Sequence, residues 1–235
     1  MKKGTLYLIP TPLGEGVLEA SIPAGLVVTI RNIRHFVVED LRTTRRFLKK
    51  VDKNTDIDSL RFYELNEHSR DEETAILLKP LLEGHDMGLM SEAGTPCVAD
   101  PGASLVTLAH AAGIRVAPLV GPSSITLALM ASGFNGQNFT FHGYLPVDRK
   151  ARQQALRRLE QEAMQNDQTQ IFIETPYRNM KMLESIIDTL RPSTLLCIAA
   201  NLTGTEEFIR TLSVGEWKKE IPGIHKQPAV FLIYT

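Results

Sequence analysis

Short apolar runs alternate with longer amphipathic segments along the first half of the chain, and this alternation limits the possible folds. The short runs are apolar enough to be strands buried on both faces, as parallel strands are. They lie at 5–10, 26–30, 35–40, 87–91 and 115–120. Helical patterns lie at 42–51, 70–84 and 103–113. The order predicts a doubly wound α/β domain with a parallel sheet.

The second half repeats this order less regularly. A helix is expected at 123–133, after a Gly-Pro-Ser-Ser cluster that suits a helix start, and two more at about 149–165 and at 177–190. Strands are expected at 138–145, 169–174, 194–201, 206–214 and 229–235. Because the run 206–217 is typical of a hairpin arm, the second sheet is predicted to be mixed. We therefore expect two α/β domains, 1–120 and 121–235, with Trp217 packed against the second sheet.

Composition narrows the class of partner and compartment. The 26 Lys and Arg residues and 27 Asp and Glu residues give a net charge of −1, so any basic surface must be local. Cys97 and Cys197 form no Cys-x-x-Cys motif, which indicates a reducing compartment. The apolar runs fall short of the roughly 18 residues of a membrane span. The sequence predicts a cytoplasmic protein, without a membrane partner.

Three loops rich in glycine or proline follow predicted strands, at 10–16, 90–102 and 120–124. Ligands of open α/β sheets bind beyond the carboxyl ends of the strands, and glycine lets the backbone approach a ligand closely. The loops match neither G-x-G-x-x-G nor G-x-x-x-x-G-K-[ST], so a phosphate-free ligand is favoured. Such loops also serve simply to turn the chain. The sequence has no H-x-x-x-H motif or Cys/His cluster, and no metal is expected.

Six segments carry a resemblance to a known family. They are GTLYLIPTPLGE, VVEDLRTTRRFL, ELNEHS, GLMSEAGTPCVADPG, GPSSITLALMASGFNGQNFTFHGYLP and IFIETPYR. In this order and spacing they resemble the tetrapyrrole methylase superfamily, and within it the 16S ribosomal RNA cytidine 2′-O-methyltransferases. The resemblance implies a homodimer of two-domain α/β chains. It also implies S-adenosylmethionine as cofactor, in a cleft between the domains, and the small ribosomal subunit as partner.

The same resemblance implies a set of cofactor-binding residues. It implies that the methionine and ribose parts are bordered by Ala93, Gly94, Thr95 and Val98. It also implies that the same cleft is lined after the first strand by Pro12 and Gly14, and that the cofactor is contacted from the linker side by Ser123 and Ser124. In the second domain it points to segments that hold the adenosine: Glu174, Thr175, Asn201, Leu202, Pro228 and Ala229. A compact sulfonium with an amino-acid tail needs backbone donors, a few hydroxyls and an apolar slot, which these residue types supply.

The segment 39–50 is the candidate for the substrate side. Two carboxylates, Glu39 and Asp40, end a predicted strand and are the predicted catalytic residues, with Glu39 as base or orienting group. Four cations follow at helical spacing on one face: Arg42, Arg45, Arg46 and Lys49. Such a face suits RNA phosphates, although a solvated helix face begun by acidic residues gives the same pattern. The family's E-D-x-R-x-T-R segment favours the RNA interpretation.

Other polar residues are open to two interpretations. Asn66 and His68 are predicted to contact a base or ribose, although such a histidine is often exposed or capping. His142 is expected at the edge of the core, bonded to backbone, and Asp100 in a turn or facing the cofactor. The basic run 148–158 is expected to be a solvated helix face or an extension of the RNA track.

The chain also departs from the ribosomal branch. Where that branch carries A-R-E-L-T-K, the residues here lack the three charges, at Ala200, Asn201 and Gly204. Two alternatives to the RNA methyltransferase therefore stay open. One is a methylase of a small molecule such as a tetrapyrrole, which would need a deep trough. The other is a catalytically silent module that only binds the cofactor.

Overall fold

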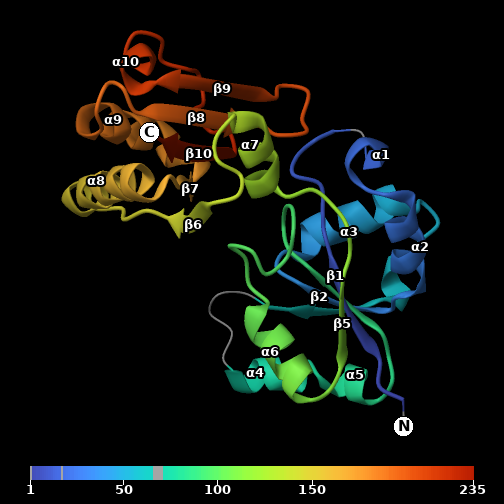
Figure 1. Ribbon diagram of the computed structural model, residues 1–235. Helices are drawn as coiled ribbons and strands as arrows, with labels where there is room; N and C mark the ends of the chain where they lie inside the picture. Colours follow the sequence, from blue (N-terminus) through green and yellow to red (C-terminus); the bar gives the residue numbers. More distant parts are fainter. Residues whose placement is uncertain (1, 17, 66–70) are drawn as a thin grey trace. The chain divides into compact units, whose positions relative to one another are not determined.

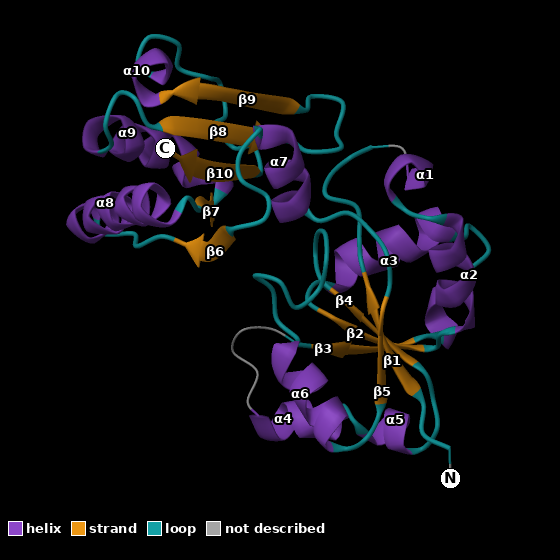
Figure 2. Cartoon of the chain, in the orientation of Figure 1, coloured by secondary structure: helices purple, strands orange, loops and turns teal. Residues whose placement is uncertain are grey.

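The computed structural model describes residues 2–16, 18–65 and 71–235. The chain forms two compact units, Met1–Ser123 and Ser124–Thr235. Each has one five-stranded sheet, of order β3-β2-β4-β1-β5 in the first unit and β6-β7-β10-β8-β9 in the second (Figures 1 and 2). The described helices include none that is long and apolar enough to cross a membrane.

The first sheet is parallel throughout, as the sequence predicted. Its strands are β1 (Thr5–Ile9), β2 (His35–Val38), β3 (Arg61–Glu64), β4 (Met87–Met90) and β5 (Arg115–Pro118). The edge strand β3 was missed, because its charged ends and aromatic centre give no apolar run. Ile9 pairs with Met90, and Val38 pairs with the same methionine from the other side. The carboxyl ends of β1, β2 and β4 therefore lie at one level.

Helices cover both faces of this sheet (Figure 2). One core layer joins the sheet to α2 (Ala24–Asn32) and α3 (Leu41–Val51), near the short α1 (Leu18–Ser21) and the 3₁₀ turn η1 (Ile57–Ser59). The other joins it to α4 (Asp71–Ile76), α5 (Lys79–Leu82) and α6 (Ala103–Ala111). This double covering explains why the inner strands are apolar on both faces.

Two predictions for this unit were wrong. The run 26–30 is not a strand but lies inside α2. Leu26 and Ile30, four residues apart, are buried, whereas Val28 between them is 60% exposed, so the apolar run packs as one helical face. The predicted helix 70–84 is two helices, α4 and α5. Pro80 lies at the start of α5, and a proline disfavours helical continuity through the residues before it.

The second sheet is mixed, as predicted: β6 (Phe139–Tyr144) pairs parallel with β7 (Thr169–Glu174), and the other pairs are antiparallel. The remaining strands are β8 (Leu195–Ala200), β9 (Phe208–Ser213) and β10 (Ala229–Tyr234). The helices are α7 (Ser124–Ser132), α8 (Arg149–Asn166), α9 (Asn179–Thr189) and α10 (Val214–Trp217), with the 3₁₀ turn η2 (Pro176–Arg178). The predicted hairpin arm is confirmed in its first part as β9, which pairs antiparallel with β8, whereas its last residues form α10.

The core of the second unit is built around aromatic side chains. Phe172 and Phe231 are cross-strand neighbours whose rings stack at a centroid distance of 5.6 Å. Trp217 is fully buried against the sheet, as predicted, and its indole N–H donates to the Leu196 carbonyl at 2.9 Å. A buried indole with its donor satisfied adds apolar area at little polar cost.

Two histidines stack at the amino end of the first sheet. The rings of His35 and His85 lie 5.1 Å apart, and His35 Nδ1 lies 3.0 Å from the Tyr63 hydroxyl. Burial, with smaller contributions from His85 and Arg61, lowers the pKa of His35. The unfolded chain therefore binds this proton more readily than the folded chain, and folding stability falls as the pH drops through the ordinary histidine range.

We predict that His35→Gln weakens the acid sensitivity of the first unit. The free energy of unfolding, measured by urea denaturation, should fall less between about pH 7.5 and about pH 5.5 than in the wild type. The reason is that glutamine has no proton to bind, whereas the lowered pKa of His35 favours the unfolded chain in acid. His110→Gln is the matched control, since His110 is exposed on α6 of the same unit. An unchanged pH dependence in His35→Gln would contradict the prediction.

Candidate functional site: two loop edges

The loops after β1 and β4 are joined by a pair of backbone hydrogen bonds. Thr11 N donates to the Gly94 carbonyl at 2.9 Å, and Gly94 N donates to the Thr11 carbonyl at 3.1 Å. Thr11 is buried, and its hydroxyl lies 3.4 Å from the Ser91 carbonyl. The two loops are therefore held together independently of any ligand.

Gly94 occupies a position that disfavours a side chain. Its φ is +80°, and a Cβ there would lie 2.9 Å from Leu13 Cδ2 and 3.6 Å from the Pro122 carbonyl oxygen. Gly121 is similarly tight, because a Cβ there would lie 2.3 Å from Pro10 Cγ. The loops 10–16, 91–102 and 119–123 thus contact one another at the carboxyl edge of the sheet.

These contacts place the predicted cofactor residues of the first unit along one edge. Ala93 and Val98 are exposed, Thr95 is half-buried and Gly94 is buried. Pro12 is half-buried and Gly14 exposed on the loop after β1, and Ser123 is half-buried at the end of the unit. Small side chains on loops that contain glycine are what the predicted ligand type needs.

Carboxylates gather at the same edge. Glu39 Oε2 accepts from Glu92 N at 3.3 Å, which connects the end of β2 to the loop after β4. Burial, with the charges of Glu39 and Glu92, raises the pKa of Asp100 to about 6, although a Ser91 hydrogen bond opposes the rise. Burial and Asp100 also raise the pKa of Cys97 to about 11. Asp100 is the member of this group to which the sequence assigned no definite role.

Asp40 has a structural task. Its side chain caps α3 by accepting from Thr43 N at 2.6 Å, and its hydrogen bonds with Thr43 lower its pKa. A carboxylate engaged in this way is a poor proton acceptor. Of the two predicted catalytic carboxylates, Glu39 is the one that faces the loop after β4.

The four predicted cations of α3 are all exposed. The Arg45 guanidinium lies over the Phe62 ring, 5.4 Å from its centroid. Arg46 lies 4.0 Å from the Glu15 carboxylate, and Lys49 Nζ lies 3.3 Å from the Lys53 carbonyl. These weak contacts at an exposed surface leave the charges accessible to an anionic partner. Asn66 and His68 lie outside the described residues.

A second edge of loops is formed in the second unit. Ala229 at the start of β10 pairs with Glu174 on β7 and with Ala200 on β8. Asn201 N donates to the Pro228 carbonyl at 3.0 Å, and Leu202 is buried next to it. The register of one strand thus brings the three predicted adenosine segments together. Ser124 is half-buried at the start of α7.

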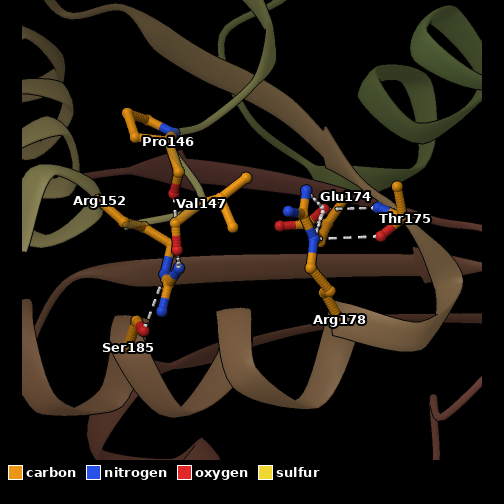
Figure 3. A network of polar contacts seen from close by, with 7 residues as sticks. All are labelled: Pro146, Val147, Arg152, Glu174, Thr175, Arg178 and Ser185. Atoms are coloured by element: carbon orange, nitrogen blue, oxygen red, sulfur yellow. Dashed lines mark hydrogen bonds and ion pairs between the residues drawn. The ribbon is translucent and has the colours of Figure 1, made fainter. Parts of the chain in front are cut away.

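Glu174 is buried, and one oxygen of its carboxylate has several partners (Figure 3). Its Oε1 accepts from Thr175 N at 2.6 Å and from Arg178 Nε and Nη2 at 2.9 and 2.5 Å. Arg178 Nε also lies 3.2 Å from Thr175 Oγ1. The ion pair fixes the turn between β7 and η2, and its only signal in the sequence is the spacing of four residues.

The turn after β8 lacks the three charges of the ribosomal branch and adopts a tight conformation. Asn201 adopts a left-handed conformation with φ 50°, which asparagine tolerates better than most residues. Gly204 N donates to the Asn201 carbonyl, and a Cβ on Gly204 would lie 3.0 Å from that oxygen. A lysine at this position would therefore strain the turn that this chain forms.

Two polar residues of this unit differ from expectation. His142 Nε2 lies 2.7 Å from Gln170 Oε1, so its partner is a side chain and not the backbone. Arg152, in the basic run 148–158, is buried and donates to Ser185 Oγ at 3.0 Å and to the Val147 carbonyl at 2.7 Å (Figure 3). The run is therefore a solvated face only in part, and Arg152 connects α8 to α9.

Comparison with known proteins decides the family. A family model described as tetrapyrrole (corrin/porphyrin) methylases matches residues 5–217. The chain belongs to this family. The predicted family is thereby confirmed, and the protein is a methyltransferase.

Relatives from two bacteria carry the name ribosomal RNA small subunit methyltransferase I. The one from Escherichia coli O157:H7 is 35% identical over 98% of this chain and 78% of its own length. The one from Vibrio cholerae is 32% identical over 97% of this chain and 76% of its own.

Two solved structures share the fold. The methyltransferase CobJ aligns with a TM-score of 0.66 at 18% identity, covering 99% of this chain and 94% of that one. Uroporphyrin-III-C-methyltransferase from Thermus thermophilus aligns with a TM-score of 0.57 at 17% identity, covering 98% of this chain and 92% of that one. At these identities the two structures establish the fold alone.

We predict that Gly94→Ala destabilises the first unit whereas Gly14→Ala does not. A non-glycine residue at left-handed φ costs about 1–2 kcal/mol, and the Leu13 side chain must also move. A Cβ on Gly14 would meet no atom within 4 Å. Urea denaturation of both variants checks the difference, and equal stabilities would contradict the geometry of the loop.

Proposed function

We propose that the protein transfers a methyl group from S-adenosylmethionine to a ribose 2′-hydroxyl of 16S ribosomal RNA in the small ribosomal subunit. One observation carries the proposal. The cationic face of α3 begins next to Glu39, and the Glu39 carboxylate bonds to the loop after β4. A surface for phosphates and a group for a reacting hydroxyl are thus adjacent within one unit. The names of the relatives support the same substrate class.

The residues at both edges fit S-adenosylmethionine. Glu39, Glu92 and Asp100 complement a ligand whose sulfonium and ammonium are both positive. Thr95 offers a hydroxyl to its amino-acid part, and Gly94, whose N–H and carbonyl are bonded to Thr11, has no side chain that would obstruct the ligand. In the second unit, Leu202, Pro228 and Ala229 are apolar residues of the kind that suits a neutral adenine. Pro228 is exposed, and the other two are buried beside it. We assign the methionine and ribose side of the cofactor to residues of the first unit and its adenosine side to residues of the second.

The protein's own residues then have two tasks. When bound, S-adenosylmethionine supplies a methyl group already activated by its sulfonium, so alignment in line with the hydroxyl is the main requirement. Glu39 orients that hydroxyl and accepts its proton as the oxygen–carbon bond forms and the carbon–sulfur bond breaks. Asp100, ionised above about pH 6, keeps the edge negative. Asp40 acts through α3, whose first turn it caps.

The cations Arg42, Arg45, Arg46 and Lys49 hold the RNA backbone in this proposal. The Phe62 ring under Arg45 restrains that guanidinium, so less conformational freedom is lost when a phosphate binds it. Asn66 and His68 remain predicted contacts to a base or ribose. Because ribosomal subunits are cytoplasmic particles, we propose that the enzyme is cytoplasmic. By family resemblance we also propose that it is a homodimer.

The decisive experiment is methyl transfer from labelled S-adenosylmethionine to small ribosomal subunits from a strain that lacks this protein. We expect label at a ribose of 16S RNA. The rate of methyl transfer should rise with pH through about 6, as Asp100 ionises, and the Glu39→Gln variant should lose most of that rate. Deproteinised 16S RNA in parallel shows whether the whole subunit is required. If the protein binds S-adenosylmethionine in calorimetry but no label reaches the RNA, the proposed substrate is wrong and the cofactor assignment stands.

We predict that Arg42→Ala/Arg45→Ala weakens RNA binding and flattens its salt dependence. The slope of log K against log salt should fall by about 0.7 for each phosphate of single-stranded RNA that the variant no longer neutralises. Arg157→Ala/Arg158→Ala is the charge-matched control, since both residues are exposed on α8. If only the control variant changed the slope, α8 and not α3 would carry the RNA track.

A further inference from the structure

An exposed tyrosine of the second unit is paired with a lysine. Tyr177, the middle residue of η2, is 71% exposed. The Lys226 ammonium lies 5.7 Å from its ring centroid. A single exposed aromatic residue needs no explanation by itself. A ring held beside a cation, however, presents a flat surface on which a planar group of an anionic ligand can stack. Neither residue belongs to the proposed cofactor site.

Hydrogen bonds between the two loops hold Tyr177 and Lys226 in place. Lys226 N donates to the Pro176 carbonyl at 3.0 Å. The fully buried Asn179 donates from Nδ2 to the carbonyls of Ile224 and Gln227 at 3.2 and 2.6 Å. The loop that carries Lys226 is therefore tied to the turn that carries Tyr177. Little ordering entropy remains to be lost when a ligand binds such a prearranged surface.

The other side of the turn is fixed by the ion pair of Glu174 and Arg178 (Figure 3). Glu174 is paired across the sheet with Ala229, so the tyrosine lies beside the second loop edge and only three residues along the chain from Glu174. His225, also exposed, adjoins Lys226. An open aromatic ring among cationic and neutral polar groups suits an anionic ligand with planar bases.

We propose that Tyr177 stacks on a nucleobase of single-stranded RNA and that Lys226 contacts the neighbouring phosphate. This inference rests on the proposed function and extends it, because it gives the second unit a part in substrate binding. Bases splayed out of single strands are commonly bound on tyrosine rings beside a cationic backbone contact. A purely apolar protein partner would gain nothing from the lysine over the ring.

The test measures binding of a fluorescein-labelled single-stranded fragment of 16S RNA to the full-length chain by anisotropy, without cofactor. Tyr177→Ala should raise Kd about tenfold, and Tyr177→Trp should restore most of the affinity. Lys226→Ala should weaken binding less and lower the salt slope. Tyr144→Ala, at another tyrosine of this unit that is 55% exposed, should leave Kd unchanged.

Two results would overturn the inference. One is a Tyr177→Ala variant that binds the fragment as the wild type does. The other is a variant that keeps its RNA affinity and loses affinity for S-adenosylmethionine in calorimetry, which would place the cofactor's adenine on the ring. If the predicted changes in Kd are observed but no methyl group reaches 16S RNA in subunits, the proposed function fails and the RNA-binding role of Tyr177 stands.

Discussion

The reciprocal hydrogen bonds between Thr11 and Gly94 are the interaction on which the candidate site depends. Parallel pairing of β1 and β4 brings their carboxyl ends to one level, but loops of this length have many conformations available there. The backbone pair selects one of them without using any side chain. It also explains the glycine, because a side chain at φ +80° would be strained and would meet Leu13. Thr95 and the nearby carboxylates, which this backbone pair does not use, are the groups that our proposal assigns to ligand binding.

The second unit reaches a comparable result with an antiparallel strand. Ala229 pairs with Glu174 on one side and with Ala200 on the other, so segments distant in the sequence share one edge. In the first unit the shared direction of the strands aligns the loops, whereas here the register of a central strand does so. The buried ion pair of Glu174 and Arg178 then shapes the turn that follows. Site geometry in both units is thus a consequence of strand pairing.

The sequence predicted much of the fold because the inner strands are buried on both faces and the helices are amphipathic. It failed where local pattern and packing disagree. The run 26–30 has the β-branched composition of a strand. It is nevertheless helical, because Leu26 and Ile30, four residues apart, pack into the core as one helical face. For the site, motif resemblance indicated loops and residue types. It could not show that Asp40 is a helix cap or that Arg152 is buried. Nor could it show that burial, together with the charges of Glu39 and Glu92, raises the pKa of Asp100. Those facts depend on contacts between residues far apart in the sequence.

A net charge of −1 conceals a separation of signs within the first unit. Carboxylates lie on the loops at the edge of the sheet, and cations lie along the adjoining helix. The two groups suit opposite ligands, since a sulfonium with an ammonium is attracted to the first and a phosphate backbone to the second. Asp40, as the cap of α3, connects them: it is acidic like the loops, and it fixes the first turn of the helix that carries the cations. A chain of nearly zero net charge can in this way bind a cationic cofactor and a polyanionic substrate without a large charge of either sign.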